Sequence, residues 1–398
     1  MKPLLDRIVA GRYCVGCGLC ASVAEPGALE MAENADGFLV PRRRKPGTEP
    51  PSLREFCPGI TLKQPRAHRG PEKIYGPFAS LWTAHAVDEE IRRKASSGGC
   101  ISALLVYLLE QGEVDGVLHV GKAAADPLRN QTYFSVSRED VLRRAGSRYA
   151  PSALLAGWLD CLRTGKKIAV VGKPCDIAAV DRFLALHPEF EPQIACKISF
   201  LCMGVPSQNG TNRLVAALGL AEADVRDFWY RGEGWPGKAT AIDAAGARRE
   251  MSYEESWGRI LSKDVNFRCK ICPDGFGEFA DVSCGDAWFA REGRPDFAER
   301  PGRSLAFIRS ERGRKLFEAA RAAGYVAAEP FAVEDLKTIQ LSQYQRKIHA
   351  GVRIAALKLL GDRLLDFSGF CLLANLGKAR LASVVRNFWG TVRRRRAA

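Results

Sequence analysis

Apolar and polar residues alternate in two different ways along the middle of the chain. Apolar runs at 81–87, 114–121, 167–172 and 198–202 predict strands, and apolar residues at helical spacing over 101–112, 151–165 and 176–186 predict helices. A further strand and helix are predicted over 304–310 and 311–324. Because strands alternate with helices, the pattern indicates an α/β core with a mixed, partly parallel sheet.

The flanking regions follow other patterns. The first 67 residues are interrupted by prolines, and residues 28–43 resemble the strand–turn–strand of a ferredoxin half. Residues 227–251 contain two strand-like runs around a glycine-rich turn, which predicts an inserted hairpin. We therefore expect a small N-terminal module (1–67), an α/β core (68–340) and a helical tail (341–398).

Length and composition fit a packed protein of more than one domain. The chain has 398 residues, of which 46% are hydrophobic, and single cores usually stop growing near about 250 residues. Its 13 cysteines come without an export signal at the start, which favours metal or cluster ligation over disulfides. No apolar run reaches the roughly 18 residues of a membrane span, so we expect a cytoplasmic protein.

Basic charge is concentrated in the last part of the sequence. The formal net charge is +14, and from Gln343 onward 12 Lys and Arg stand against 2 acidic residues. Since the rest is nearly balanced, the charge does not indicate a nucleic-acid-binding core. Apolar residues recur at helical spacing over 354–365 and 381–389. These amphipathic helices can pack on the core or on a second subunit, or lie peripherally on the inner membrane surface.

Three closely spaced cysteines give the sharpest chemical signal. Cys14, Cys17 and Cys20 form C-x-x-C-x-x-C, a loop that turns three thiolates toward one iron–sulfur cluster. The fourth cysteine of bacterial ferredoxins is missing at its usual position, but Cys57 supplies a Cys-Pro pair further on. We assign these four cysteines to one [4Fe-4S] cluster. A structural zinc site is the alternative, because zinc also accepts four thiolates.

A second group of cysteines lies in the core region. Cys269 and Cys272 form C-x-x-C, which alone fits a redox disulfide, a zinc site or a cluster. A proline and two glycines follow closely and oppose the helix of a thioredoxin-like site, so a metal or cluster loop is favoured. Cys175 and Cys202 lie at the ends of predicted strands, where α/β sheets gather ligands. Each of these two taken alone is by default a buried apolar thiol.

Six short motifs follow one another along the chain: KASSGG (94–99), AGSRY (145–149), GKPCD (172–176), FLCMG (200–204), C-x-x-C (269–272) and ADVSCGDAW (280–288). In this order they resemble the beta subunits of coenzyme F420 hydrogenases and dehydrogenases. This family of iron–sulfur flavoproteins includes ferredoxin-dependent chlorophyll-pathway reductases and bacterial members encoded with polysaccharide-synthesis enzymes. The resemblance implies FAD and a nearby [4Fe-4S] cluster held by Cys175, Cys202, Cys269 and Cys272. Cys284 stands where the family usually has a small or apolar residue, and we interpret it as a core thiol.

The polar motifs also suit a flavin on physical grounds. Ser96 and Ser97 precede a predicted helix and can offer donors to a pyrophosphate, or simply cap the helix. Lys173, the predicted catalytic residue, could place a cation beside the flavin pyrimidine, the alternative being a solvated loop lysine. Asp286 could bind a ribityl hydroxyl or cap a turn. The predicted cofactor-binding residues are Lys94, Ser96, Ser97, Gly98, Gly99, Gly146, Ser147, Arg148, Tyr149, Gly172, Lys173, Pro174 and Asp286.

Two other patterns do not indicate a site. GEGWPG (232–237) matches G-x-G-x-x-G, but strand-like residues follow where a dinucleotide fold needs a helix. His85 and His119 lie in strand-like runs, and we interpret them as core or rim residues.

Taken together, the sequence predicts an oxidoreductase with an α/β core, a ferredoxin-like module and a basic helical tail. Two [4Fe-4S] clusters and FAD would pass electrons between a ferredoxin-like or deazaflavin (F420-type) partner and an organic substrate. The alternatives are a non-catalytic electron-relay subunit of a larger complex and a zinc-stabilised protein of polysaccharide or membrane assembly. A homo-oligomer is compatible with the sequence.

Overall fold

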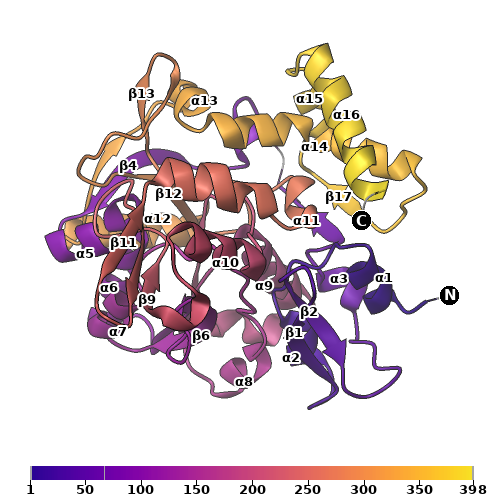
Figure 1. Ribbon diagram of the computed structural model, residues 1–398, viewed down its shortest axis with the longest axis horizontal. Coiled ribbons are helices and arrows are strands. Elements are labelled where there is room, and N and C mark those ends of the chain that lie inside the picture. Colours follow the sequence, from indigo (N-terminus) through magenta and orange to yellow (C-terminus); the bar gives the residue numbers. More distant parts are fainter. Residues whose placement is uncertain (1, 67, 397–398) are drawn as a thin grey trace.

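An eight-stranded mixed sheet forms the centre of the computed structural model, which describes residues 2–66 and 68–396 (Figure 1). The strand order is β16–β4–β15–β12–β8–β7–β5–β6. The four inner strands β12, β8, β7 and β5 are parallel, and the outer strands pair antiparallel. The strands are β4 Ser80–Ala86, β5 Gly116–Lys122, β6 Asn130–Ser135, β7 Ile168–Gly172, β8 Ile194–Phe200, β12 Val282–Asp286, β15 Ser304–Ile308 and β16 Val326–Pro330.

Both faces of this sheet are covered, as the continuous apolar runs require. In β7, Ile168 and Val170 face one core while Ala169 and Val171 face the other. Helices α8 (Trp158–Arg163) and α9 (Pro174–Leu186) belong to the first core, and α6 (Cys100–Glu110) and α12 (Glu311–Ala322) to the second. The central α/β prediction is therefore confirmed.

The N-terminal region packs into the first of these cores. Its elements are α1 Leu4–Ala10, α2 Leu19–Val23, β1 Leu29–Glu33, β2 Leu39–Arg43, α3 Leu53–Phe56 and β3 Thr61–Lys63. Strands β1 and β2 form an antiparallel hairpin, which is the predicted strand–turn–strand. Leu19 and Phe56 share one apolar cluster with Leu155 and Trp158, so this region is continuous with the α8 and α9 side of the sheet.

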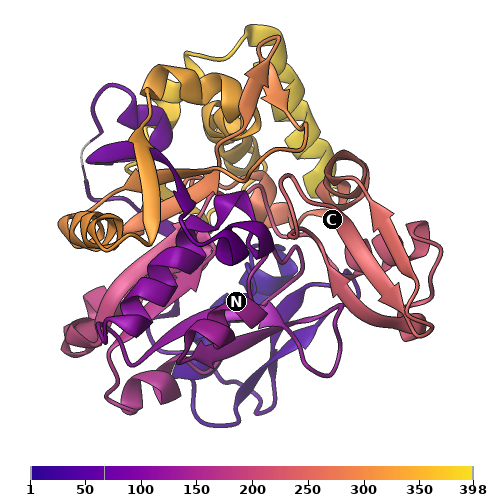
Figure 2. The same ribbon diagram turned by 90° about the vertical axis from the view of Figure 1, so that its left-hand side faces the viewer.

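Two predicted elements differ in extent. The helix expected over 151–165 begins only at Trp158, because Gly157 adopts a non-helical conformation and a turn precedes it. The expected hairpin is present as β9 (Val225–Trp229) and β10 (Ala239–Asp243), and β11 (Arg248–Met251) adds a third strand (Figure 2). The other elements are α4 Glu72–Tyr75, α5 Glu89–Lys94, α7 Arg138–Arg143, α10 Gln208–Ala217, α11 Phe267–Lys270, β13 Phe289–Arg291, β14 Arg294–Asp296 and α13 Leu336–Ile339.

The last part of the chain returns to the N-terminal region. It contains α14 (Leu341–Leu359), β17 (Asp366–Ser368), α15 (Leu372–Leu376) and α16 (Leu381–Arg396). Strand β17 pairs in parallel with β3, and α16 packs on α14. In Figure 1 these elements lie at the same end of the molecule as α1 and α3. None of the helices in the described part of the chain is long and apolar enough to span a bilayer.

Candidate cofactor site

The first four predicted cysteines lie close to one another. Burial raises the pKa of Cys20, and the neighbouring Cys17, Cys14 and Cys57 raise this pKa further. Cys14 accepts a hydrogen bond from Gly16 N–H at 3.4 Å, and each of the other three also accepts at least one peptide N–H. Peptide N–H donors stabilise thiolates, which are the form that ligates iron.

The second four cysteines converge beside α9. Burial raises the pKa of Cys202 to about 12, with Cys269 and Cys272 adding to the effect. The pKa of Cys175 is raised by burial and by nearby Asp176, and also by Cys202 and Cys269. Cys269 accepts a 3.4 Å hydrogen bond from a peptide N–H. The four cysteines that the family resemblance implies thus come from four segments: the start of α9, the residues just after β8, α11 and the loop after α11.

The donor chemistry of both sets fits thiolate-held clusters. Each set offers four thiols, and peptide N–H groups point at the sulfurs. Within residues 2–66 and 68–396, no three His, Cys, Asp or Glu side chains form a site for a single metal ion. The fit of the two thiol sets to iron–sulfur clusters therefore rests on the number and type of the donor atoms.

Arg268 connects the two cysteine sets. Its guanidinium, 1% exposed, donates from Nε to Gly59 O at 2.7 Å and from Nη2 to Pro58 O at 2.8 Å. Asn266 Nδ2 donates to Cys14 O at 3.1 Å. Since Pro58 follows Cys57 and Arg268 precedes Cys269 in the chain, the two sets are adjacent.

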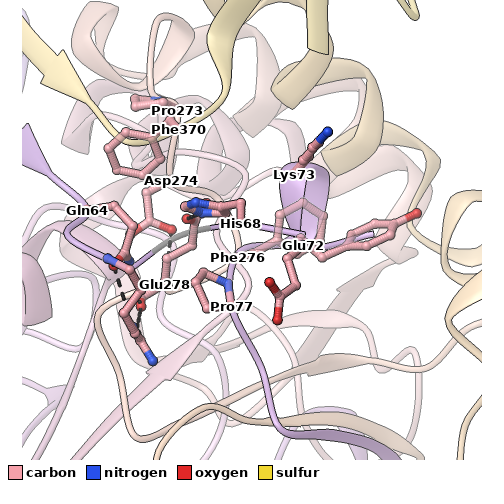
Figure 3. A network of polar contacts seen from close by, with 12 residues as sticks. Gln64, His68, Glu72, Lys73, Pro77, Pro273, Asp274, Phe276, Glu278 and Phe370 are labelled. Carbon is pink, nitrogen blue, oxygen red and sulfur yellow. Dashed lines mark hydrogen bonds and ion pairs between the residues drawn. The ribbon is translucent and has the colours of Figure 1, made fainter. Parts of the chain in front are cut away.

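A buried charge network holds the loop that follows the second set (Figure 3). The Glu278 carboxylate accepts a hydrogen bond from Lys347 of α14, and its other oxygen lies 3.1 Å from His68 Nε2. Burial opposes ionisation of Glu278, but Lys347 and His68 lower its pKa overall. Lys347 also donates to Pro273 O at 3.0 Å, and Asp274 Oδ1 accepts from Glu278 N–H at 3.0 Å. Helix α14 is thereby tied to this loop.

A cavity of about 470 Å³ opens at the carboxyl ends of the parallel strands. This is the position at which open α/β sheets bind ligands, and the volume lies within the range of cofactor pockets, about 300–1,000 Å³. Cys202 lines the cavity, so the second cysteine set borders it directly. The predicted residues in its wall are Ser96, Ser97, Gly99, Gly146, Ser147, Arg148, Tyr149, Gly172, Lys173 and Asp286.

Three predicted residues lie outside this wall. A Cβ on Gly98, whose φ is +76°, would lie 2.7 Å from the backbone of Gly302, so this glycine permits close packing between two loops. Lys94 pairs at 3.0 Å with Glu90 on the surface. Pro174 is the first residue of α9.

Hydrogen bonds join the first two polar motifs. Ser96 Oγ accepts from both the N–H and the hydroxyl of Ser147, each at 2.8 Å. Arg148 donates to Asn130 Oδ1 at 2.8 Å and to backbone carbonyls, which fixes the turn after Ser147. Residues far apart in sequence are thus held in one wall.

Asp286 is a central hydrogen-bond acceptor in the cavity wall. Its carboxylate accepts two hydrogen bonds from Arg231, at 2.8 and 2.9 Å, and one each from Ser97 Oγ (2.6 Å) and Trp235 Nε1 (2.7 Å). Burial opposes its charge, but these partners lower the pKa of Asp286 overall. Arg231 and Trp235 come from the loop between β9 and β10, where the GEGWPG pattern lies. Both oxygens of Asp286 are therefore engaged by protein groups.

Lys173 is a buried residue of the cavity wall, 7% exposed. Its Nζ donates to Ser152 Oγ at 2.9 Å and lies 2.8 Å from Asp176 Oδ2. Burial opposes its charge, but Asp176 and Cys175 raise the pKa of Lys173 overall. The second oxygen of Asp176 has no partner within the described residues, although it is buried and Asp176 lines the cavity. A donor group on a bound ligand would satisfy it.

His119 occupies the cavity wall as a neutral residue. Its Nε2 lies 2.7 Å from Ser135 Oγ, and burial lowers the pKa of His119 to about 4, with Arg144 adding to the effect. This agrees with the interpretation of His119 as a core or rim residue.

Sequence reasoning missed an aromatic and amide part of the wall. Tyr253, Trp257 and Trp288 line the cavity, as do Gln340 and Gln343 at the start of α14. Gln340 Nε2 donates to Asp286 O at 2.6 Å. Of these, only Trp288 lies within a recognised motif, so the others carried no local signal.

The fold and the site define an α/β protein with two thiol sets, the second of which borders one cofactor-sized cavity. Residues 81–158 match the N-terminal part, and residues 165–334 the C-terminal part, of the coenzyme F420 hydrogenase/dehydrogenase beta subunit. The chain belongs to this family, which confirms the resemblance of its motifs.

Several known relatives are subunits and enzymes named for coenzyme F420. The F420-dependent sulfite reductase of Methanocaldococcus jannaschii is 26% identical over 86% of this chain, and the match spans 51%, about half, of that protein. The F420 hydrogenase subunit beta of Methanosarcina barkeri is 26% identical over 66% of this chain and 84% of its own.

A solved structure supports the fold. One chain of the F420-reducing [NiFe] hydrogenase complex from Methanosarcina barkeri matches with a TM-score of 0.56 and 21% identity. The match covers 78% of this chain and 99% of that one.

Proposed function

We propose that this chain is an iron–sulfur flavoprotein oxidoreductase that passes electrons between a one-electron carrier or F420-type deazaflavin and an organic substrate. The main observation in support is that Cys202, a member of the second thiol set, lines the cavity formed by the family motifs. The relatives named as F420-dependent enzymes and subunits support the same class of reaction.

The proposal assigns each cofactor to its own residues. Cys14, Cys17, Cys20 and Cys57 would hold one [4Fe-4S] cluster within residues 1–67. Cys175, Cys202, Cys269 and Cys272 would hold the second, and the cavity of residues 68–340 would hold FAD. A flavin exchanges two electrons and a cluster exchanges one, so the bound groups together supply a conversion between the two kinds of transfer.

The chain's own residues supply orientation and charge. The Arg231–Asp286 pair fixes the loop between β9 and β10 over the cavity, and Lys173 places a buried cation in the wall. Such a fixed cation favours negative charge developing on a ligand beside it. The unpartnered Asp176 oxygen is the acceptor for a ligand N–H or O–H.

Anaerobic purification tests the cofactor assignment. We expect iron and acid-labile sulfide for two cubanes together with extractable FAD. Cys14→Ser and Cys57→Ser should each lower the iron content by about half while FAD stays bound, and Cys371→Ser, a free cysteine outside both sets, should lower neither. Full iron content in Cys14→Ser would refute the first ligand set.

An electron-relay role is the second candidate, because several relatives are subunits of larger enzymes. Rapid mixing of reduced F420 with the oxidised protein distinguishes the two. Flavin bleaching by reduced F420 alone supports a substrate site on this chain, whereas bleaching only with a reduced ferredoxin-type carrier supports the relay.

A further inference from the structure

Helix α16 packs on α14 partly through polar side chains. Asn387 Oδ1 accepts hydrogen bonds from the Arg353 guanidinium of α14 at 2.7 and 3.0 Å. Ser383 Oγ lies 2.9 Å from His349 Nε2, also on α14. An amphipathic helix that covers a core normally buries its apolar side. The inward side of α16 instead mixes the polar Ser383 and Asn387 with the half-buried Val384 and Phe388 and the buried Val392.

One stripe of apolar residues on α16 faces outward. Leu381, Val385 and Trp389 are 78%, 49% and 61% exposed. Their spacing of four residues places them along one face of the helix. On the neighbouring α15, Leu373 is 85% exposed. Figure 1 shows both helices (yellow) at the outer edge of the molecule. Exposed apolar side chains grouped in this way mark an interaction surface.

The charges around this face all have one sign. Residues 378–396 contain seven Lys and Arg and no Asp or Glu. Arg395 turns inward, donating to Gly11 O at 3.1 Å, while the other basic side chains are exposed: Lys378, Arg380, Arg386, Arg393, Arg394 and Arg396. The outward face of α16 thus combines a Leu-Val-Trp stripe with flanking cations.

We propose that the outward face of α16 binds an anionic lipid membrane surface. Leu381, Val385 and Trp389 would enter the headgroup boundary, where an indole ring is favourably placed, and the flanking cations would contact lipid phosphates. A second copy fits this face poorly, because a twofold contact would bring two sets of six exposed cations together. This inference does not depend on the proposed redox function. It would place the protein at a membrane surface.

Vesicle co-sedimentation of the full-length protein tests the proposal. We expect binding to vesicles of phosphatidylglycerol and phosphatidylcholine in equal parts, at least tenfold weaker binding to phosphatidylcholine alone, and weakening between about 0.1 and 0.5 M NaCl. The triple variant L381S/V385S/W389S should bind at least tenfold more weakly. All three side chains are exposed, so the fold should persist, which circular dichroism checks.

A matched control removes three exposed apolar side chains elsewhere. The variant V87S/V136S/L186S should bind the anionic vesicles as the unchanged protein does. Absence of vesicle binding, or equal binding by L381S/V385S/W389S and the unchanged protein, would overturn the proposal. A dimer in sedimentation velocity that the α16 variant converts to a monomer, without vesicle binding, would assign the face to a second copy instead.

Discussion

At the scale of single residues, the Arg231–Asp286 pair dominates the cavity wall. Asp286→Asn leaves the buried Arg231 guanidinium without a counter-charge, which typically costs about 3–5 kcal/mol of stability. We expect a lower midpoint in chemical unfolding and reduced FAD content. Asp36→Asn is the control, because the Arg12–Asp36 pair is exposed and should contribute less than about 1 kcal/mol. Equal losses of stability in Asp286→Asn and Asp36→Asn would contradict the assignment of Asp286 as the buried counter-charge of Arg231.

His119 predicts a pH dependence with a defined sign. Burial lowers the pKa of His119 from 6.5 to about 4, so between these values the unfolded chain binds the proton and the folded chain does not. The stability contribution of neutral His119 is therefore complete above pH 6.5 and falls as the pH drops toward 4. His119→Gln should flatten the decline of the melting temperature between pH 7 and pH 5. An identical pH profile for both proteins would contradict the shifted pKa.

Short motifs were sufficient to predict ten of the residues that line the cavity, among them Ser96, Ser147 and Asp286. They could not predict Arg231 or Trp235, since these residues reach Asp286 only through the fold of a loop that carries a misleading glycine pattern. They also could not show that Lys173 is buried against Ser152 and Asp176, because burial depends on packing between distant segments.

At the scale of elements, α14 is anchored by one buried ion pair. Lys347→Met removes the ion-pair partner of the buried Glu278 and leaves only His68 and the charge of Arg309 to stabilise the carboxylate, so we expect a loss of about 3–5 kcal/mol in the free energy of unfolding. Lys358→Met, at an exposed position near the end of the same helix, should change it little. Urea unfolding measures both.

A double variant isolates the charge interaction in this pair. Adding Glu278→Gln to Lys347→Met removes the unpaired carboxylate, so part of the lost stability should return. Additive losses in the double variant would mean that packing, rather than charge, anchors α14.

Elements with strong periodicity were predicted well, among them β7, α6 and α12. The helix expected over 151–165 was predicted too long, because apolar spacing continues through Leu154 and Leu155, which are buried in a turn before α8. Strand β11 was missed because its four residues are largely polar and exposed. Its partner β10, which contains the β-branched Thr240 and Ile242 and whose first three residues are buried, carried the signal.

At the scale of the whole molecule, Arg268 joins the N-terminal region to the core. Arg268→Met would leave the buried carbonyls of Pro58 and Gly59 without donors, at a cost of about 1–3 kcal/mol for each. We expect lower stability and faster loss of iron from both cysteine sets on exposure to a chelator. The exposed Arg163→Met is the control. Unchanged iron retention in Arg268→Met would argue against Arg268 as a residue that stabilises both cysteine sets.

Sequence alone indicated the basic end of the chain and its two amphipathic patterns. It could not show which side of α16 meets the protein, because that depends on polar partners such as His349 and Arg353 on α14. The parallel pairing of β17 with β3 was equally unpredictable, since three-residue strands have no periodicity to recognise.

This pairing sets an order of events during synthesis. Strand β3 begins at Thr61, whose N–H is bonded to Cys57 O, and its only strand partner in the described structure is β17. Translation at about 5–20 residues per second delivers Asp366 roughly 15–60 s after Thr61. The nascent N-terminal region therefore leaves the ribosome with the edge of β3 unpaired, and the neighbourhood of Cys57 is completed only after β17 has been synthesised.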